Sequence, residues 1–298
     1  MHTYSVAANG AIGKQVPEIN TQSYGGAECG TTNGATLDHT GSYVYVSLNG
    51  ALESGDQFCA TIQTFQISSS GVLTFKGDTV LNTFKEIDTP PVVSGNDTFA
   101  YNLQQVSESC ELMINGFTRE SSGTLELSSI SETDPPTQPN VWAAYIPALM
   151  TADPTNHLAV AMYPTNGPCG PTGPFQLASF TEESQGDIKS TNTWRNMPAL
   201  AGGVNAMRMS PAGNLLAVAT GAGVQIFHFN GANPITKYTG VLGTGGISYL
   251  YWDNSNHLFA AGGTKLHVFT VTTTSAVEAP GSPYTIPSGV SALVVRPL

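Results

Sequence analysis

The sequence has few basic residues and no long hydrophobic run. Only 10 of its 298 residues are lysine or arginine, against 21 aspartates and glutamates, which gives a formal net charge of −11. Such a chain repels phosphate backbones and anionic lipids, so we expect neither a nucleic acid nor a membrane as a partner. No apolar run approaches the roughly 18 residues of a membrane span. The opening residues Met1-His2-Thr3 carry no signal-like region, so we expect any export signal to have been removed or not included.

Cysteine is scarce and widely spaced. The four cysteines, Cys29, Cys59, Cys110 and Cys169, form no Cys-x-x-Cys pair and have no histidine at zinc-site intervals. We therefore expect no metal site. An even cysteine number in a lysine-poor chain rich in serine, threonine, asparagine and glycine favours disulfides and an extracellular or periplasmic location. A cytosolic protein with four inert buried thiols would have the same composition.

One motif recurs through most of the chain. It consists of aspartate or serine, two variable residues, then glycine, asparagine or aspartate, followed by an alternating apolar strand. Its copies begin at Asp38, Ser94, Asp153, Ser210 and Asp253. Their fourth positions are 41, 97, 156, 213 and 256, at intervals of 56, 59, 57 and 43 residues. These residue types are typical of hairpin turns, and the period suits one four-stranded sheet plus loops.

A second motif alternates with the first. It places an aromatic residue, then glycine six positions later, then isoleucine or leucine two positions further on. Its copies begin at Tyr4, Phe65, Phe117, Phe180, Phe229 and Phe269. The copy at Phe229 is two residues shorter, and Ser275 replaces the glycine in the last copy. An aromatic strand, a glycine turn and another β-rich strand indicate the outer hairpin of a propeller blade.

Together the two motifs predict an all-β fold: a β-propeller of six visible four-stranded blades, in one domain over residues 1–298. Six outer hairpins are present but only five second strands, and the segment 290–297 resembles the inner strand at 204–211. We therefore expect the C-terminal inner strand to close the ring beside the N-terminal outer hairpin. A missing N-terminal segment longer than one strand would allow a seventh blade.

Three stretches resemble a known family. Tyr43-Val44-Tyr45-Val46, Phe65-Gln66-Ile67 followed by Gly71-Val72-Leu73-Thr74, and residues 210–218 are similar to the lactonase-like propellers, which include 6-phosphogluconolactonase and the YVTN-repeat surface proteins. The resemblance spans nearly the whole chain and implies a seven-bladed architecture. It also implies either a cofactor-free hydrolase of lactones or an extracellular binding module. No local motif fixes the family's catalytic residues in this sequence.

Candidate ligand contacts lie on the expected channel face of the propeller. Arg195, in an inter-blade loop, and Arg208, on an inner strand, are the candidate cations; otherwise they are surface or blade-to-blade residues. The loop carboxylates Glu28, Asp88 and Glu108 are candidate bases or calcium ligands, unless they are simply solvated. Trp142 is a candidate platform for a sugar ring or an aromatic wedge between blades.

The four cysteines also fall on this expected face. We predict the pairs Cys29–Cys59 and Cys110–Cys169, because each joins loops of the same or adjacent blades, with Cys59–Cys110 as the leading alternative. Bridged cysteines need Cα atoms within about 7 Å.

Two functions remain open at this point. The chain is either a hydrolase of a small sugar lactone at the channel mouth or a non-catalytic exported propeller that binds a glycan or a protein. It contains no hydrolase elbow, zinc motif, P-loop or dinucleotide fingerprint, and repeat geometry explains its histidines. We expect a monomer without a cofactor. Because few cations are present, a hydrolase should prefer an uncharged or weakly charged lactone to a phosphorylated one.

Overall fold

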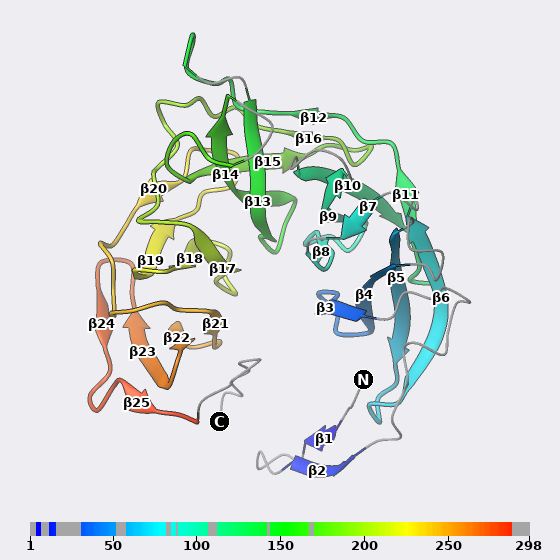
Figure 1. Cartoon of the computed structure of the whole chain (residues 1–298). Helices are drawn as coiled ribbons and strands as arrows, with labels where there is room; N and C mark the ends of the chain where they lie inside the picture. The colour runs from blue at the N-terminus through cyan, green and yellow to red at the C-terminus, as the bar shows by residue number, and fades with distance from the viewer. Residues whose placement is uncertain are drawn as a thin grey trace. The chain divides into compact units, whose positions relative to one another are not determined.

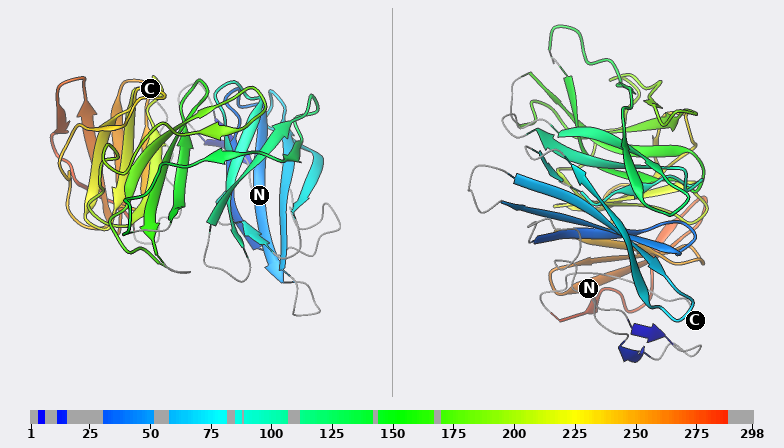
Figure 2. Two further views of the ribbon diagram at one scale, coloured as in Figure 1. Left: turned by 90° about the horizontal axis from the view of Figure 1, so that it is seen from above. Right: turned by 90° about the vertical axis from the view of Figure 1, so that its right-hand side faces the viewer.

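The computed structural model describes residues 4–6, 12–15, 31–51, 58–81, 85–87, 89–106, 112–141, 144–166 and 170–287. All regular structure in these ranges is β-strand, arranged as antiparallel sheets (Figures 1 and 2). No helix in the described ranges has the length and apolarity to cross a membrane. The sheets are the blades of a β-propeller, as the sequence predicts.

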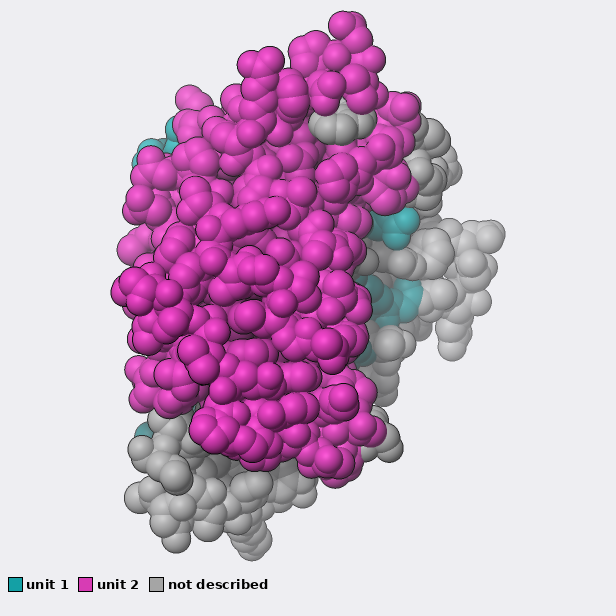
Figure 3. Space-filling model, turned by 90° about the vertical axis from the view of Figure 1, so that its left-hand side faces the viewer, with its two compact units in different colours: residues 1–132, 183–188, 298 teal, residues 133–182, 189–297 magenta. Residues whose placement is uncertain are grey.

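The chain divides into two compact units, coloured separately in Figure 3. Unit 1 comprises residues 1–132, 183–188 and 298, and unit 2 comprises residues 133–182 and 189–297. Each unit is described by itself below. A single domain over residues 1–298 remains a prediction.

The N-terminal hairpin is present as expected. Strands β1 (Tyr4–Val6) and β2 (Ile12–Gln15) form a two-stranded antiparallel sheet. The segment 290–297, which we expect beside it, lies outside the described residues. Ring closure and the total number of blades therefore remain predictions.

The first complete blade, in unit 1, is a four-stranded sheet in chain order. Its strands are β3 (Thr31–Leu37), β4 (Tyr43–Ala51), β5 (Phe58–Ile67) and β6 (Leu73–Leu81). Strand β4 buries both faces because it is a second strand with a neighbour on either side. Val44 and Val46 pack with Phe65 on one face, whereas Tyr45 packs on the other against Phe117 of the next blade.

The second blade, also in unit 1, has a broken inner strand. Its strands are β7 (Lys85–Ile87), β8 (Val92–Val93), β9 (Phe99–Val106), β10 (Leu112–Arg119) and β11 (Leu125–Ser128). Both β7 and β8 pair with β9. Pro90 and Pro91 separate them, since proline has no N–H to donate to a strand ladder. The Thr89 hydroxyl fills the gap by accepting the Leu103 N–H at 3.1 Å.

Unit 2 contains three blades. The third blade of the chain consists of β12 (Glu132–Thr133), β13 (Ala144–Ala152), β14 (His157–Thr165), β15 (Gln176–Glu182) and β16 (Ile188–Lys189). The fourth consists of β17 (Val204–Met209), β18 (Leu215–Thr220), β19 (Gly223–His228) and β20 (Thr236–Lys237). The fifth consists of β21 (Tyr249–Trp252), β22 (His257–Gly262), β23 (Lys265–Val271), β24 (Ala276–Glu278) and β25 (Tyr284–Thr285). Along the chain, the boundary between the units falls within β12 and β16.

The cores of unit 2 lie between successive blades. Phe227 and Val218 of the fourth blade pack against Leu177 of the third. The opposite face of the fourth blade, with Ile226, packs against Trp252 and Phe269 of the fifth. The fourth blade is thus apolar on both faces, as expected in a propeller, where a blade has no core of its own.

The first sequence motif forms the turn between the first and second strands of each blade. Its leading residue is buried in all five copies: Asp38, Ser94, Asp153, Ser210 and Asp253. In every copy the side-chain oxygen of this residue accepts a backbone N–H four or five positions later, at 2.7 to 3.2 Å. Aspartate and serine recur there because their short oxygens satisfy the turn's own backbone.

The second motif forms the outer hairpins and also joins blades. Gly123 and Gly186 have φ of +88° and +84°, which favours glycine. The Tyr45 hydroxyl of the first blade donates to the Gly123 carbonyl at 2.9 Å. The Tyr101 hydroxyl of the second blade likewise donates to the Gly186 carbonyl at 3.1 Å. The carbonyls of Gly123 and Gly186 therefore each accept a tyrosine hydroxyl from the preceding blade.

Candidate functional site

The first strands of the three blades in unit 2 lie next to one another. Strand β17 contacts both β13 and β21, and Figure 1 shows these strands on one side of the three blades, with β20 and β24 on the other. The Trp252 indole N–H on β21 donates to the Arg208 carbonyl on β17 at 3.1 Å. This contact fixes the backbone of β17 against β21.

Arg208 is an unpaired cation on this surface. Its side chain is accessible to solvent, yet desolvation by the surrounding protein lowers its pKa, an effect that the neighbouring Tyr251 opposes. No carboxylate among the described residues pairs with it. The role of Arg208 as a ligand contact stays a prediction.

Arg195 is the second sequence-predicted cation, and it is exposed. Its guanidinium stacks 4.8 Å above the ring centroid of Trp194. Its loop is anchored by Gln176, whose amide donates to the carbonyls of Trp194 at 3.3 Å and Met197 at 3.0 Å. The Tyr145 hydroxyl donates to the Gln176 amide oxygen at 2.9 Å, and because burial raises the pKa of Tyr145 to about 12, this donor keeps its proton.

The two arginines lie at opposite ends of the blades. Arg208 is two residues before the turn at Ser210, and that turn lies beside the turn at Asp153 because Pro154 packs against Gly213. The loop of Arg195 is anchored to Gln176 at the start of β15, which lies beside the end of β14. Strand β14 spans roughly 25 Å, and the turn at Asp153 lies at its other end. One phosphate group cannot contact both guanidinium groups. This placement agrees with the expectation of a ligand that carries little charge.

Most histidines in the described residues belong to turns or strands. His157 and His257 occupy equivalent positions, with Nδ1 at 3.2 and 2.7 Å from Asp153 and Asp253. These are the carboxylates that accept the turn N–H groups, so repeat geometry explains both histidines, as the sequence predicts. His39 makes a similar contact with Asp97 at 3.4 Å.

Sequence reasoning missed a polar cluster on the fifth blade. His267, which is 3% exposed, places its Nδ1 2.8 Å from Glu278, and Ser282 donates to the same carboxylate oxygen at 2.8 Å. Burial opposes ionisation of Glu278, but the Ser282 and His267 contacts outweigh it, so its pKa is lowered. The other ring nitrogen of His267 is buried without a partner. It is closed off from solvent and cannot reach a substrate.

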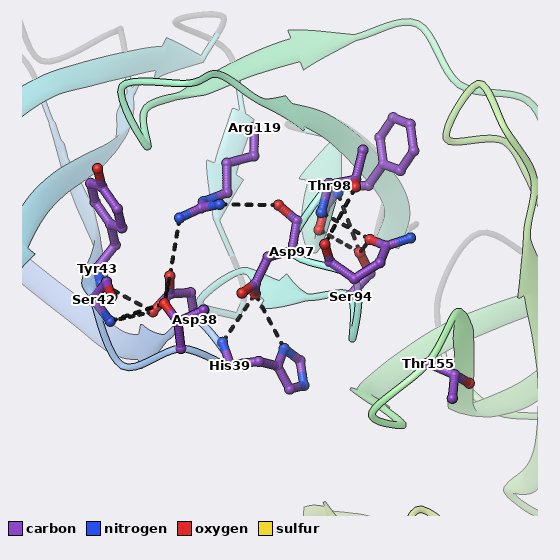
Figure 4. Close-up of polar contacts among 12 residues, drawn as sticks. Asp38, His39, Ser42, Tyr43, Ser94, Asp97, Thr98, Arg119 and Thr155 are labelled. Atoms are coloured by element: carbon purple, nitrogen blue, oxygen red, sulfur yellow. Dashed lines mark hydrogen bonds and ion pairs between the residues drawn. The ribbon is translucent and has the colours of Figure 1, made fainter.

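A second missed cluster lies in unit 1 (Figure 4). Arg119 donates to the Asp38 carboxylate at 3.0 Å, to the Tyr45 hydroxyl at 2.9 Å and to the Asp97 carbonyl at 3.3 Å. Its guanidinium also lies 4.8 Å above the Tyr43 ring. Desolvation lowers the pKa of Arg119, but its contacts with Tyr45, Asp38 and Asp97 outweigh this and raise it. A guanidinium with so many partners joins two blades and is not available to a ligand.

The remaining candidates lie outside the described residues. These are Glu28, Asp88, Glu108 and Trp142, together with the side chains of Cys29, Cys59, Cys110 and Cys169. The backbone of Cys59 belongs to β5 and pairs with Gly50. No group of three or more histidine, cysteine, aspartate or glutamate residues in the described ranges is arranged to hold a metal ion.

Comparisons with known proteins show the fold. No family model matches the chain. No curated protein matches it either. A Lactobacillus plantarum structure is 13% identical with a TM-score of 0.52, over 82% of this chain and 68% of the other. Sqt1 from Chaetomium thermophilum is 11% identical with a TM-score of 0.51, over 86% of this chain. The chain spans only 61% of the Sqt1 chain.

A third neighbour has a lower TM-score. It is a Bacteroides uniformis protein with a provisional 6-phosphogluconolactonase assignment, 13% identical over 85% of each chain, with a TM-score of 0.44. The likeness in fold rests on the first two structures, whose scores are higher. At these identities, what this chain shares with its neighbours is the β-propeller fold.

Proposed function

We propose that unit 2 binds a sugar acid, which carries one carboxylate, or the corresponding uncharged lactone, at Arg208 on β17 beside β21. The observation that carries this proposal is the accessible, unpaired guanidinium whose pKa the surrounding protein lowers. Holding a desolvated charge without a partner costs free energy, so such groups are concentrated at functional sites. Only 10 residues of this chain are lysine or arginine, so few other cations could hold a carboxylate.

The surroundings of Arg208 favour a weakly charged ligand. A planar guanidinium binds one carboxylate through two parallel hydrogen bonds. A phosphate dianion needs further cations to offset its desolvation, and Arg195 is at the other end of the blades. Tyr251, which interacts electrostatically with Arg208, offers an aromatic ring and a hydroxyl to a sugar.

Lactone hydrolysis is the activity that the family resemblance supports. It needs a general base or an activated water as well as a cation. No described carboxylate or histidine is hydrogen-bonded to Arg208. The alternative within the same proposal is that the chain binds the sugar acid or lactone without hydrolysing it.

Replacing Arg208 with glutamine should weaken gluconate binding by about tenfold or more, since it removes a charge-assisted contact of about 1.5 to 3 kcal/mol. Calorimetry measures binding, and a pH-stat assay with gluconolactone and its 6-phosphate measures hydrolysis. The matched control is Arg195→Gln, which should change neither. Equal binding by wild type and Arg208→Gln, or a strong preference for the phosphorylated lactone, would contradict the proposal. Binding without hydrolysis would identify a binding module.

A protein partner is also compatible with this fold. Sqt1 has additionally been solved with the N-terminus of the ribosomal protein L10 bound, so a propeller of related fold holds a peptide. We include a protein partner in the proposal for this chain, and the next subsection develops it from the chain's own residues.

We further propose that the chain works in an oxidising compartment, outside the cell or in the periplasm, with its cysteines paired. Denatured, unreduced protein should then show no free thiols in a dithionitrobenzoate titration, and the reduced sample should show four. Peptide mapping would distinguish Cys29–Cys59 with Cys110–Cys169 from the alternatives. Four free thiols in the unreduced sample would reject both the pairing and the compartment.

A further inference from the structure

The outer edge of the second blade is incomplete. Strand β10 runs from Leu112 to Arg119, but β11 pairs only with residues 116–119. The first half of β10, residues 112–115, pairs with β9 on its inner side. No described strand pairs with this half on its outer side.

The hydrogen bonds of β10 show which of its backbone groups have no described partner strand on the outer side. The Arg119 N–H donates to the Thr98 carbonyl at the β9 side, whereas the Thr118 N–H donates to the Ser128 hydroxyl at the β11 side. Successive residues of a strand point to alternate sides, and β10 has no bulge. The N–H and C=O of Ile114 therefore point outward. No other described residue accepts from or donates to them.

A pocket of about 340 Å³ opens at this edge. Its apolar wall consists of Met113, Ile114, Leu127 and Ile130. The side chains of Met113 and Leu127 are 48% and 49% exposed, respectively. Ile130 packs against Gly116, where any side chain would overlap it. The chain after β11 thus crosses β10 rather than continuing beside it, and the pocket occupies the space that a longer fourth strand would fill.

Asn115, Ser128 and Ser129 form the polar part of the pocket lining. The Asn115 amide nitrogen donates inward to the Gln104 amide oxygen at 2.5 Å, and Gln104 is only 2% exposed. Because the amide is planar and its nitrogen is directed inward, its oxygen remains as an acceptor at the pocket. The site therefore combines a backbone donor and acceptor, a side-chain acceptor and an apolar wall.

We propose that this edge docks an extended segment of a partner protein, which adds to the blade as a strand beside Ile114. Its backbone pairs with the Ile114 N–H and C=O, and one apolar side chain enters the pocket between Met113 and Leu127. Main-chain pairing supplies affinity in this mode of recognition and the side-chain pocket supplies specificity.

Charge further defines the segment. Residues 112–118 and 125–132 contain two carboxylates, Glu126 and Glu132, and no lysine or arginine. A segment with lysine or arginine beside its apolar residue complements this surface. The proposal is independent of the Arg208 site, which lies in unit 2.

The test is a selection of random twelve-residue peptides displayed on phage against the whole chain, followed by fluorescence anisotropy with synthetic peptides. Enriched peptides should combine an apolar residue with lysine or arginine. The variants Met113→Lys and Leu127→Lys should weaken their binding by about tenfold or more, because each removes apolar contact worth about 1.5 to 3 kcal/mol. Val277→Lys, at an equally apolar position that is 60% exposed, is the matched control and should have no effect.

A second probe distinguishes backbone pairing from simple hydrophobic contact. The same peptide with alternate amides N-methylated cannot donate to β10 and should lose binding to the wild type. Retained binding of the methylated peptide, no enriched peptide at all, or binding unaffected by both lysine variants would overturn the proposal. A dimer in sedimentation that Met113→Lys dissociates would overturn it in favour of a second copy of this chain.

Discussion

Replacing Gly123 with alanine should lower the free energy of unfolding by about 2 to 4 kcal/mol. An alanine at φ +88° costs about 1 kcal/mol by itself. Its Cβ would also overlap the ring of Tyr43 in the preceding blade. That ring cannot move aside easily, because Arg119 lies over it and Asp38 accepts the Tyr43 N–H at 3.0 Å. Forcing atoms into such a contact adds about 1 to 3 kcal/mol.

The matched control is Gly41→Ala in the same unit. Gly41 also has a positive φ, +68°, but nothing lies within 4 Å of a Cβ there. It should therefore cost only about 1 kcal/mol. Urea denaturation followed by circular dichroism measures both variants. Equal losses would mean that backbone conformation alone selects glycine at position 123, and that the contact with Tyr43 contributes nothing.

Replacing Arg119 with methionine should cost about 3 to 5 kcal/mol, because it leaves a buried carboxylate without its cation. The Asp38 side chain is 0% exposed and that of Arg119 is 18% exposed. The substitution keeps most of the side-chain volume but removes the donors to Asp38 and Tyr45. Burial raises the pKa of Tyr45 to about 12, partly opposed by Arg119, so the tyrosine remains neutral and adds no second negative charge beside Asp38.

A double-mutant cycle separates the ion pair from packing. Asp38→Asn alone should also be destabilising, but combined with Arg119→Met it should cost less than the sum of the two, by at least about 1 kcal/mol. Arg195→Met, an exposed arginine stacked on Trp194, is the control and should change stability by less than about 1 kcal/mol. Strict additivity in the cycle would show that the two side chains do not interact.

Sequence reasoning located the strands because the relevant signals are short-range. The turns at Asp38 and Asp253 are recognisable from a few consecutive residues, since the aspartate accepts the N–H of a residue four positions later in the same turn. Strand β4 is predicted in the same way from a short run of aromatic and β-branched residues, Tyr43-Val44-Tyr45-Val46. The break in the second blade's inner strand, by contrast, depends on two prolines that the repeat motifs do not include.

The candidate sites were harder to predict from the sequence. Arg208 was recognised from its place on an inner strand, but its lack of a partner depends on every residue around it. Arg119 was not recognised at all, because nothing in the residues beside it distinguishes it from a surface arginine. Its partner Asp38 is 81 residues away in the sequence.

The sequence by itself therefore determined the blades: their order, their turns and the hairpin glycines, all of which depend on residues a few positions apart. Only the tertiary structure decided how neighbouring blades contact each other. It brought Arg119 to Asp38 and separated Arg195 from Arg208. Among the described residues, it left Arg208 without an ion-pair partner and Ile114 without an outer strand. The physical reason is that turn and strand preferences are local properties of the chain, whereas the surroundings of a charge or a sheet edge depend on packing between residues far apart in sequence.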